Sequence, residues 1–177
     1  VPMAITMIVA FMMSAWHGVG WLRKREVRSD ALSLSFAEAG FACGLIATAT
    51  GSVWARVNWG QYWSWDPQQV GIVALLLTYA AIFALRGAVD DEDKVRNLWA
   101  VYALFGLLSA IFWTVIFRRL MPSLHPNDTL IKSEKWYRLV LWFNVFGYVA
   151  VMIKLATLRA RIEIAAHKLK EKEWNTF

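Results

Sequence analysis

The chain has 177 residues, of which 58% are hydrophobic and only 18% are charged. Its formal net charge is +6 at pH 7, and its mean hydropathy is +0.41. Soluble domains carry about 25% charged residues, so this composition excludes a water-soluble enzyme and points to a protein that crosses a membrane.

Five apolar stretches are long enough to span a bilayer. A span needs about 20 mostly apolar residues, and in lipid a single segment satisfies its own backbone groups only as a helix. The sequence therefore predicts an all-α integral membrane protein, with residues 1–177 forming a single membrane domain. The expected spans cover residues 3–22, 34–53, 70–85, 98–117 and 139–158.

Basic residues are divided unequally between the two sides of these spans. Twelve lie on the side of the first and third connections and the tail 159–177, and six lie in the loops 54–69 and 118–138. Cytoplasmic segments carry the excess of Lys and Arg. We therefore expect a multi-pass protein of the inner membrane, with both loops on the periplasmic side and the tail in the cytoplasm.

The loop 54–69 contains four of the 11 tryptophans of the chain. An aromatic belt at the membrane interface is common, but it explains poorly so dense a cluster around Gly60, closed by Asp66-Pro67. A dense aromatic shelf, with a glycine for close approach, suits a flat aromatic ligand such as a porphyrin. The shelf would comprise Trp54, Trp59, Tyr62, Trp63 and Trp65.

Charged residues near this shelf have separate expected roles. Arg56, Arg118 and Arg119 are the cations that the carboxylates of a porphyrin would seek. We expect Asp66 to fix the loop, by capping its own backbone or the start of the third helix, rather than to touch a metal. Trp63 and Trp65 would need an irregular backbone to face the same way.

A porphyrin metal needs an axial ligand on the same side of the membrane, and histidine is the usual one. Of the three histidines, His17 lies near the cytoplasmic end of the first span and His167 lies in the tail. Only His125 lies in the second outer loop, 118–138. A lone loop histidine is more often a solvated residue, but the shared side and the aromatic shelf favour His125 as the ligand.

Two further segments have simpler interpretations. The acidic run at residues 90–93 is expected to cap the start of the fourth helix. Residues 159–174 have apolar residues at helical spacing and many basic residues, which predicts an extension of the fifth span along anionic lipid. A helix that docks a partner protein is the alternative for this tail.

Several of these residues together resemble a known family. The segment Trp-Gly-Gln-Tyr-Trp-Ser-Trp-Asp-Pro, residues 59–67, resembles the WWD signature of haem-handling proteins. With residues 51–55, 85–92 and 123–126, the resemblance covers nearly the whole chain and is to the CcmC family, haem exporter protein C of cytochrome c maturation. Larger relatives, the CcsA-type synthase subunit and CcmF, share the signature but have more spans.

The resemblance implies a function and a set of partners. It implies that haem b is held at the periplasmic face of the inner membrane, with His125 as an axial ligand of the iron, and is passed to the periplasmic haem chaperone CcmE. The implied neighbours are CcmD and the ATP-hydrolysing CcmA/CcmB transporter of the ABC class. In the family a histidine directly precedes a Val-Pro pair, so with Val1-Pro2 at its start the chain is expected to lack a first span and a second axial histidine.

Other functions stay open at this point. A subunit of a CcsA-like cytochrome c haem lyase would attach haem directly to an apocytochrome. A b-type electron-transfer subunit would place its histidines within helices, which fits this chain less well. A structural subunit with a strong aromatic belt is the third alternative. We expect a haem-delivery protein rather than an enzyme.

Overall fold

The computed structural model describes residues 1–125 and 133–174, without the side chains of residues 171, 173 and 174. Parts of the expected outer loop (126–132) and of the expected tail (175–177) therefore lie outside the described residues. No strand occurs in the described ranges. The elements are α1 (Pro2–Lys24), α2 (Val27–Trp59), α3 (Pro67–Gly87), α4 (Glu92–Ile111), the π-helix η1 (Phe112–Ile116), α5 (Phe117–Leu120) and α7 (Lys135–Trp174).

Five helical segments in the described part are long and apolar enough to cross a membrane. They are α1, α2, α3, the continuous run from α4 through η1 to α5, and α7. This confirms the prediction of an all-α integral membrane protein with five spanning helices in this chain. The helices are longer than the apolar stretches because polar residues extend and cap their ends; the side chain of Asp91, for example, accepts a hydrogen bond from Lys94 N at the start of α4.

The helix α2 extends into the segment expected as the first outer loop, 54–69. It ends only at Trp59, where Gly60 adopts a left-handed conformation with φ 79° and donates its N–H to the carbonyl of Arg56. Glycine adopts this conformation without a steric penalty, and no residue between 54 and 59 interrupts the helix. The non-helical loop is therefore limited to residues 60–66.

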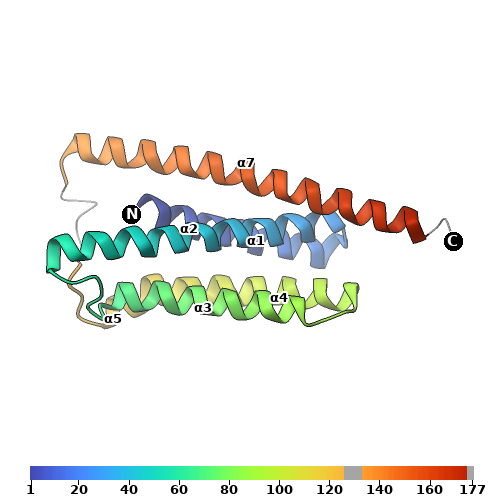
Figure 1. The fold of residues 1–177 in the computed structure, drawn as a ribbon, viewed down its shortest axis with the longest axis horizontal. Coiled ribbons are helices and arrows are strands. Elements are labelled where there is room, and N and C mark those ends of the chain that lie inside the picture. Colours follow the sequence, from blue (N-terminus) through green and yellow to red (C-terminus); the bar gives the residue numbers. More distant parts are fainter. Residues whose placement is uncertain (126–132, 175–177) are drawn as a thin grey trace.

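The helices form three layers (Figure 1). The central layer is α1 and α2, with α7 on one side and the pair α3 and α4 on the other. Val1, the loop 60–66, α5 and the start of α7 lie at one end of the molecule, which we call the tryptophan end. The turn between α1 and α2, the connection of α3 to α4 and the last turns of α7 lie at the other, which we call the basic end.

Small residues allow these layers to approach closely. A Cβ atom on Gly40 would lie 2.7 Å from the ring of Phe11, and one on Gly44 would lie 2.7 Å from Leu76 Cδ2. The Gly-x-x-x-Gly spacing of α2 thus has the packing role that such spacing favours in membrane helices. Phe11 in turn stacks on Tyr79, with ring centroids 3.7 Å apart, which joins α1 to α3.

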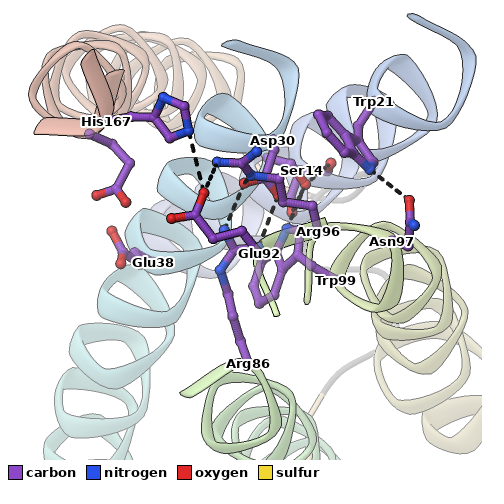
Figure 2. A network of polar contacts seen from close by, with 12 residues as sticks. Ser14, Trp21, Asp30, Glu38, Arg86, Glu92, Arg96, Asn97, Trp99 and His167 are labelled. Atoms are coloured by element: carbon purple, nitrogen blue, oxygen red, sulfur yellow. Dashed lines mark hydrogen bonds and ion pairs between the residues drawn. The ribbon is translucent and has the colours of Figure 1, made fainter. Parts of the chain in front are cut away.

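A network of buried charges and indoles closes the basic end (Figure 2). The carboxylate of Asp30 on α2 accepts hydrogen bonds from both terminal nitrogens of Arg86 on α3, at 2.9 and 2.7 Å. Arg96 Nε on α4 lies 3.8 Å from the same carboxylate. The guanidinium of Arg86 also lies over the ring of Trp99, 5.0 Å from its centroid. These contacts join three spans at one carboxylate.

The first turns of the expected tail belong to this end of the bundle. Arg159 Nε on α7 lies 3.1 Å from Glu38 Oε2 on α2, and His167 Nε2 lies 3.4 Å from Glu92 Oε2 on α4. Arg159 and His167 thus contact neighbouring helices. They can do so because α7 continues from the spanning segment without interruption. The expected contact of the remaining tail with anionic lipid stays a prediction.

Candidate functional site

The tryptophan end brings together segments that are far apart in the sequence. They are the last turns of α2, the loop 60–66, the first turn of α3, and residues 121–125, which follow α5 (Figure 1). Because α2 and α3 are joined directly by the loop, that loop is held at both ends by a spanning helix. Residues 121–125 reach it through α5, which packs against α3.

Hydrogen bonds from the flanking helices fix the conformation of the loop. Gln69 Oε1 on α3 accepts hydrogen bonds from the backbone N–H and the hydroxyl of Ser64, each at 3.0 Å. Gln69 Nε2 donates to the carbonyl of Tyr62 at 3.3 Å, and Ser52 Oγ on α2 donates to the same carbonyl at 3.1 Å. Side chains of the two flanking helices thus satisfy the loop backbone, which orders it without regular secondary structure.

The loop backbone is irregular where the sequence predicts it. Trp65 adopts the left-handed region with φ 56°, which is uncommon for a residue other than glycine. The rings of Trp63 and Trp65 meet edge to face, with centroids 5.8 Å apart and an interplanar angle of 85°. Trp65 is 77% exposed and Tyr62 is 59% exposed. The loop therefore presents aromatic rings outward at the edge of the bundle.

Asp66 is the best-connected polar residue of this end. Its side chain caps α3 by accepting a hydrogen bond from Gln68 N at 2.9 Å, as the sequence predicts. Its second oxygen, Oδ2, accepts from Ser123 Oγ at 2.8 Å and from Leu124 N at 2.6 Å. Its Oδ1 also lies 2.9 Å from His125 Nδ1. One buried carboxylate therefore ties the tryptophan loop to the histidine segment.

These contacts determine the charge of Asp66. Burial by itself raises the pKa of the carboxyl group, but the hydrogen bonds from Gln68 N, Leu124 N and Ser123 Oγ and the charge of His125 lower it. The net result is a pKa below the ordinary value of an aspartate. Asp66 is thus an ionised acceptor at neutral pH.

His125 lies between two indoles of α2. Its ring stacks on Trp54, with centroids 5.7 Å apart and an interplanar angle of 22°, and meets Trp59 edge to face at 4.7 Å. The rings of Trp54 and Trp59 also contact one another, at 5.1 Å. The imidazole keeps 24% of its surface exposed, and among the described residues its Nε2 has no hydrogen-bond partner. The structure thus brings together three of the residues that the sequence singles out.

Within the described residues, no hydrogen bond, ion pair or ring contact joins the three arginines of the expected site to this cluster. Arg56 donates to the carbonyl of Gly60, and its guanidinium lies over the ring of Tyr62, 5.7 Å from the centroid. Arg118 and Arg119 occupy the last turn of α5; Arg118 is half-buried and Arg119 is exposed. Within the described ranges, neither forms an ion pair with an acidic residue.

The side chains near His125 suit one kind of metal site. The described residues contain no group of three or more His, Cys, Asp or Glu side chains that would hold a bare metal ion. A partly exposed imidazole beside aromatic faces, with one nitrogen that has no described partner, instead suits the axial position of a metal already held in a flat macrocycle. The other described histidines lie elsewhere: His17 stacks on Phe36, and His167 pairs with Glu92 at the basic end.

Sequence reasoning overlooked the residues that hold the site in place. Ser123 and Leu124 contact Asp66, although 57 and 58 positions separate them from it, and a long-range contact of this kind leaves no local pattern. Gln69, at the end of the expected loop, hydrogen-bonds the loop backbone, a role that its place in the sequence does not indicate. The available signal was the Ser-x-His spacing, since Ser123 Oγ also accepts from His125 N at 3.1 Å.

Comparison with known proteins gives a consistent picture. The family model described as "Heme exporter protein C" (CcmC) matches residues 1–175. The chain is 31% identical to the Heme exporter protein C of Rhodobacter capsulatus over 98% of its own length and 74% of the relative's. It is 36% identical to that of Bradyrhizobium diazoefficiens over 81% of its own length and 57% of the relative's. For the Escherichia coli K12 protein, the identity is 27%, with coverages of 84% and 60%.

Proposed function

Because the chain belongs to the haem exporter protein C family, and hence to the proteins of haem export and cytochrome c biogenesis, we propose that it binds haem b at its tryptophan end. It then presents this haem, at the periplasmic face of the inner membrane, to a periplasmic haem chaperone. The haem is the cargo, and the protein is a delivery component rather than a classical enzyme.

The environment of His125 is the observation that carries this proposal. One ring nitrogen is engaged by Asp66, while the other has no partner among the described residues, and the side chain keeps 24% of its surface exposed. Two indoles fix the plane of the ring, so the second nitrogen keeps one direction. This is the environment that an axial ligand of haem iron needs, because the nitrogen lone pair must be free and oriented.

The surrounding residues supply the apolar and cationic contacts that haem needs. Trp54 and Trp59 stand beside the imidazole, and the exposed rings of Tyr62 and Trp65 extend the aromatic surface along the loop. Aromatic faces bind a porphyrin plane by stacking and by burial of apolar area. We assign Arg118 and Arg119 to the propionates, since neither guanidinium is paired with a described carboxylate and both lie at this end. Arg56 is already engaged by the loop.

The openness of the loop supports hand-over rather than storage. Tyr62 and Trp65 are largely exposed, so a ligand beside them is reachable from one edge.

The recipient in this proposal is the chaperone CcmE, and the complex partners are CcmD and the CcmA/CcmB transporter. The excess of basic residues at the other end supports the orientation, with the tryptophan end in the periplasm and α7 ending in the cytoplasm.

The test compares two histidine variants of the full chain, co-produced with the chaperone. The change His125→Ala should lower the haem content of the purified protein, shift its Soret band and reduce covalent haem on the chaperone. The change His17→Ala removes a histidine that stacks on Phe36, away from this site, and should leave all three readouts unchanged. An unchanged Soret band and unchanged chaperone loading in the His125 variant contradict the proposal. Haem attached to an apocytochrome without the chaperone supports the lyase alternative instead.

A further inference from the structure

The hydrogen bonds of Asp66 have two separate roles. Three of its contacts are to groups that shape the backbone: Gln68 N at the start of α3, and Ser123 Oγ and Leu124 N in the histidine segment. The fourth contact is to a side-chain ring, at His125 Nδ1, 59 residues away. The carboxyl side chain is fully buried, with 0% of its surface exposed. Its position is therefore fixed by the protein and not by solvent.

The contact with His125 selects one tautomer of the imidazole. Both oxygens of Asp66 already accept from N–H or O–H donors, Oδ1 from Gln68 N and Oδ2 from Ser123 Oγ and Leu124 N, so the hydrogen in this contact is carried by Nδ1. In the neutral ring the lone pair then resides on Nε2, the nitrogen without a described partner. Only a nitrogen with a free lone pair can coordinate iron.

The backbone and the ring of His125 are held by different atoms. Ser123 Oγ accepts from His125 N at 3.1 Å, which anchors the main chain. Asp66 Oδ1 holds the ring, and the stacked Trp54 sets its plane. Because the backbone already has its own anchor, the bond from Oδ1 to the imidazole is not needed to keep the segment in place.

We propose that Asp66 is a positioning residue for haem capture, which acts through His125 by fixing its Nδ1–H tautomer, aiming Nε2 and strengthening the imidazole as a donor to iron. This inference rests on the proposed function, since it takes His125 as the axial ligand. Asp66 itself does not touch the haem. Carboxylate partners of metal-bound histidines have this effect generally, and their loss weakens metal affinity by about 10- to 100-fold.

A carboxylate partner also changes which oxidation state of iron is preferred. It places partial negative charge on the imidazole, and a more electron-rich ligand favours the ferric over the ferrous ion. The variant Asp66→Asn keeps an oxygen that accepts from Gln68 N but removes the charge. It should bind haemin about 10-fold or more weakly, and its midpoint potential should shift to more positive values.

The matched control is Ser123→Ala. This change removes one hydrogen bond to Asp66 and the anchor of the His125 backbone, but it leaves the bond from Oδ1 to the ring. It should weaken the segment without moving the midpoint potential. Equal midpoint potentials for the wild type and Asp66→Asn, measured on the full chain in lipid nanodiscs with haemin, overturn the inference.

A second experiment does not require any change at Asp66. In His125→Gly, added imidazole should occupy the vacated position, bind the iron and donate its N–H to Asp66. The probe 1-methylimidazole binds iron but carries no N–H, so it should bind about 10-fold more weakly than imidazole, after correction for the affinities of both for free haemin. Adding Asp66→Asn should abolish this preference.

The outcomes separate the two proposals. If His125→Gly retains the wild-type Soret band and does not respond to imidazole, His125 is not the ligand and the proposed function of this site fails. If imidazole restores the band but 1-methylimidazole does so equally well, His125 is the ligand and the role of Asp66 is wrong. A preference for imidazole that disappears with Asp66→Asn supports both.

Discussion

Arg86 and Asp30 form a two-point contact that joins α3 to α2 across 56 residues of sequence. Each terminal nitrogen of Arg86 donates to a different oxygen of Asp30, at 2.9 and 2.7 Å. The side chains are 17% and 6% exposed. Such a fork geometry is the strongest form of the arginine–carboxylate pair. It orients two spans at the basic end (Figure 2).

Replacement of Asp30 by alanine should destabilise the protein substantially. The change leaves the guanidinium of Arg86 buried without its carboxylate, close to the second cation Arg96, which keeps its ion pair with Glu92. Breaking one side of a buried ion pair costs roughly 3–5 kcal/mol. Thermal unfolding in detergent measures the effect. Asp90→Ala, at an exposed carboxylate of the neighbouring connection, is the control and should change little; equal loss in both variants contradicts the assignment.

Replacement of Gly71 by alanine should disturb the packing beneath the site. A Cβ at Gly71 would lie 2.7 Å from the backbone carbonyl oxygen of Trp113 in η1, and a carbonyl in a helix has little freedom to move. We expect a loss of about 1–3 kcal/mol, as for other overpacked interiors. Gly87→Ala, where a Cβ meets nothing within 4 Å, is the control on the same helix. Thermal unfolding compares the two, and similar stabilities would falsify this assignment.

Replacement of Trp54 by alanine should weaken haemin binding more than the loss of another exposed indole. Trp54 stacks on the imidazole of His125, and aromatic pairs contribute about 0.5–1.5 kcal/mol beyond their buried area. Trp136 lies in the first turn of α7 at the same end and is 73% exposed, so Trp136→Ala is the matched control. Haemin titration followed in the Soret region measures both. Equal affinities in the two variants argue against a role for the stacked indole.

The cap at the start of α4 should depend on pH in a defined direction. Hydrogen bonds from the backbone N–H and the ammonium group of Lys94 hold the pKa of Asp91 below its ordinary value. A group with a depressed pKa in the folded state stabilises that state above its unfolded pKa, about 3.9, and the contribution is lost as the pH falls through the folded pKa. The protection factors of the amides in the first turn of α4, which compare their exchange with the intrinsic rate at each pH, should therefore fall below about pH 4. Asp91→Ala should show low protection throughout, and a pH-independent protection factor in the wild type would contradict the cap.

The overall architecture was predictable because its signals are local. Five apolar runs, separated by polar connections, predict five spans, and lipid permits only helices there. The caps at Asp66 and Asp91 follow from short-range preferences of aspartate. The end of α2 was harder to place, because residues 54–59 are compatible with both helix and loop. The first clear stop signal is Gly60, which caps the helix.

The site was only partly predictable because its geometry depends on long-range contacts. Sequence reasoning named His125 and the tryptophans but gave no means of deciding which indoles would touch the imidazole. Trp54 and Trp59 do so because α2 extends far enough to bring them beside the segment after α5. Trp63 and Trp65 pair with each other instead. The link from Asp66 to His125 required the fold, since 59 residues separate them.

The carboxylate of Asp66 both caps α3 and holds the imidazole of His125. Assembly of this end of the bundle and orientation of the imidazole are therefore coupled. A chain whose third helix has formed its cap has already created the acceptor that the histidine segment needs. Conversely, a chain that has not joined these segments offers haem a histidine of undefined tautomer and direction. Under the proposed function, the arrangement makes haem uptake conditional on folding, because only the completed structure displays the oriented nitrogen of His125.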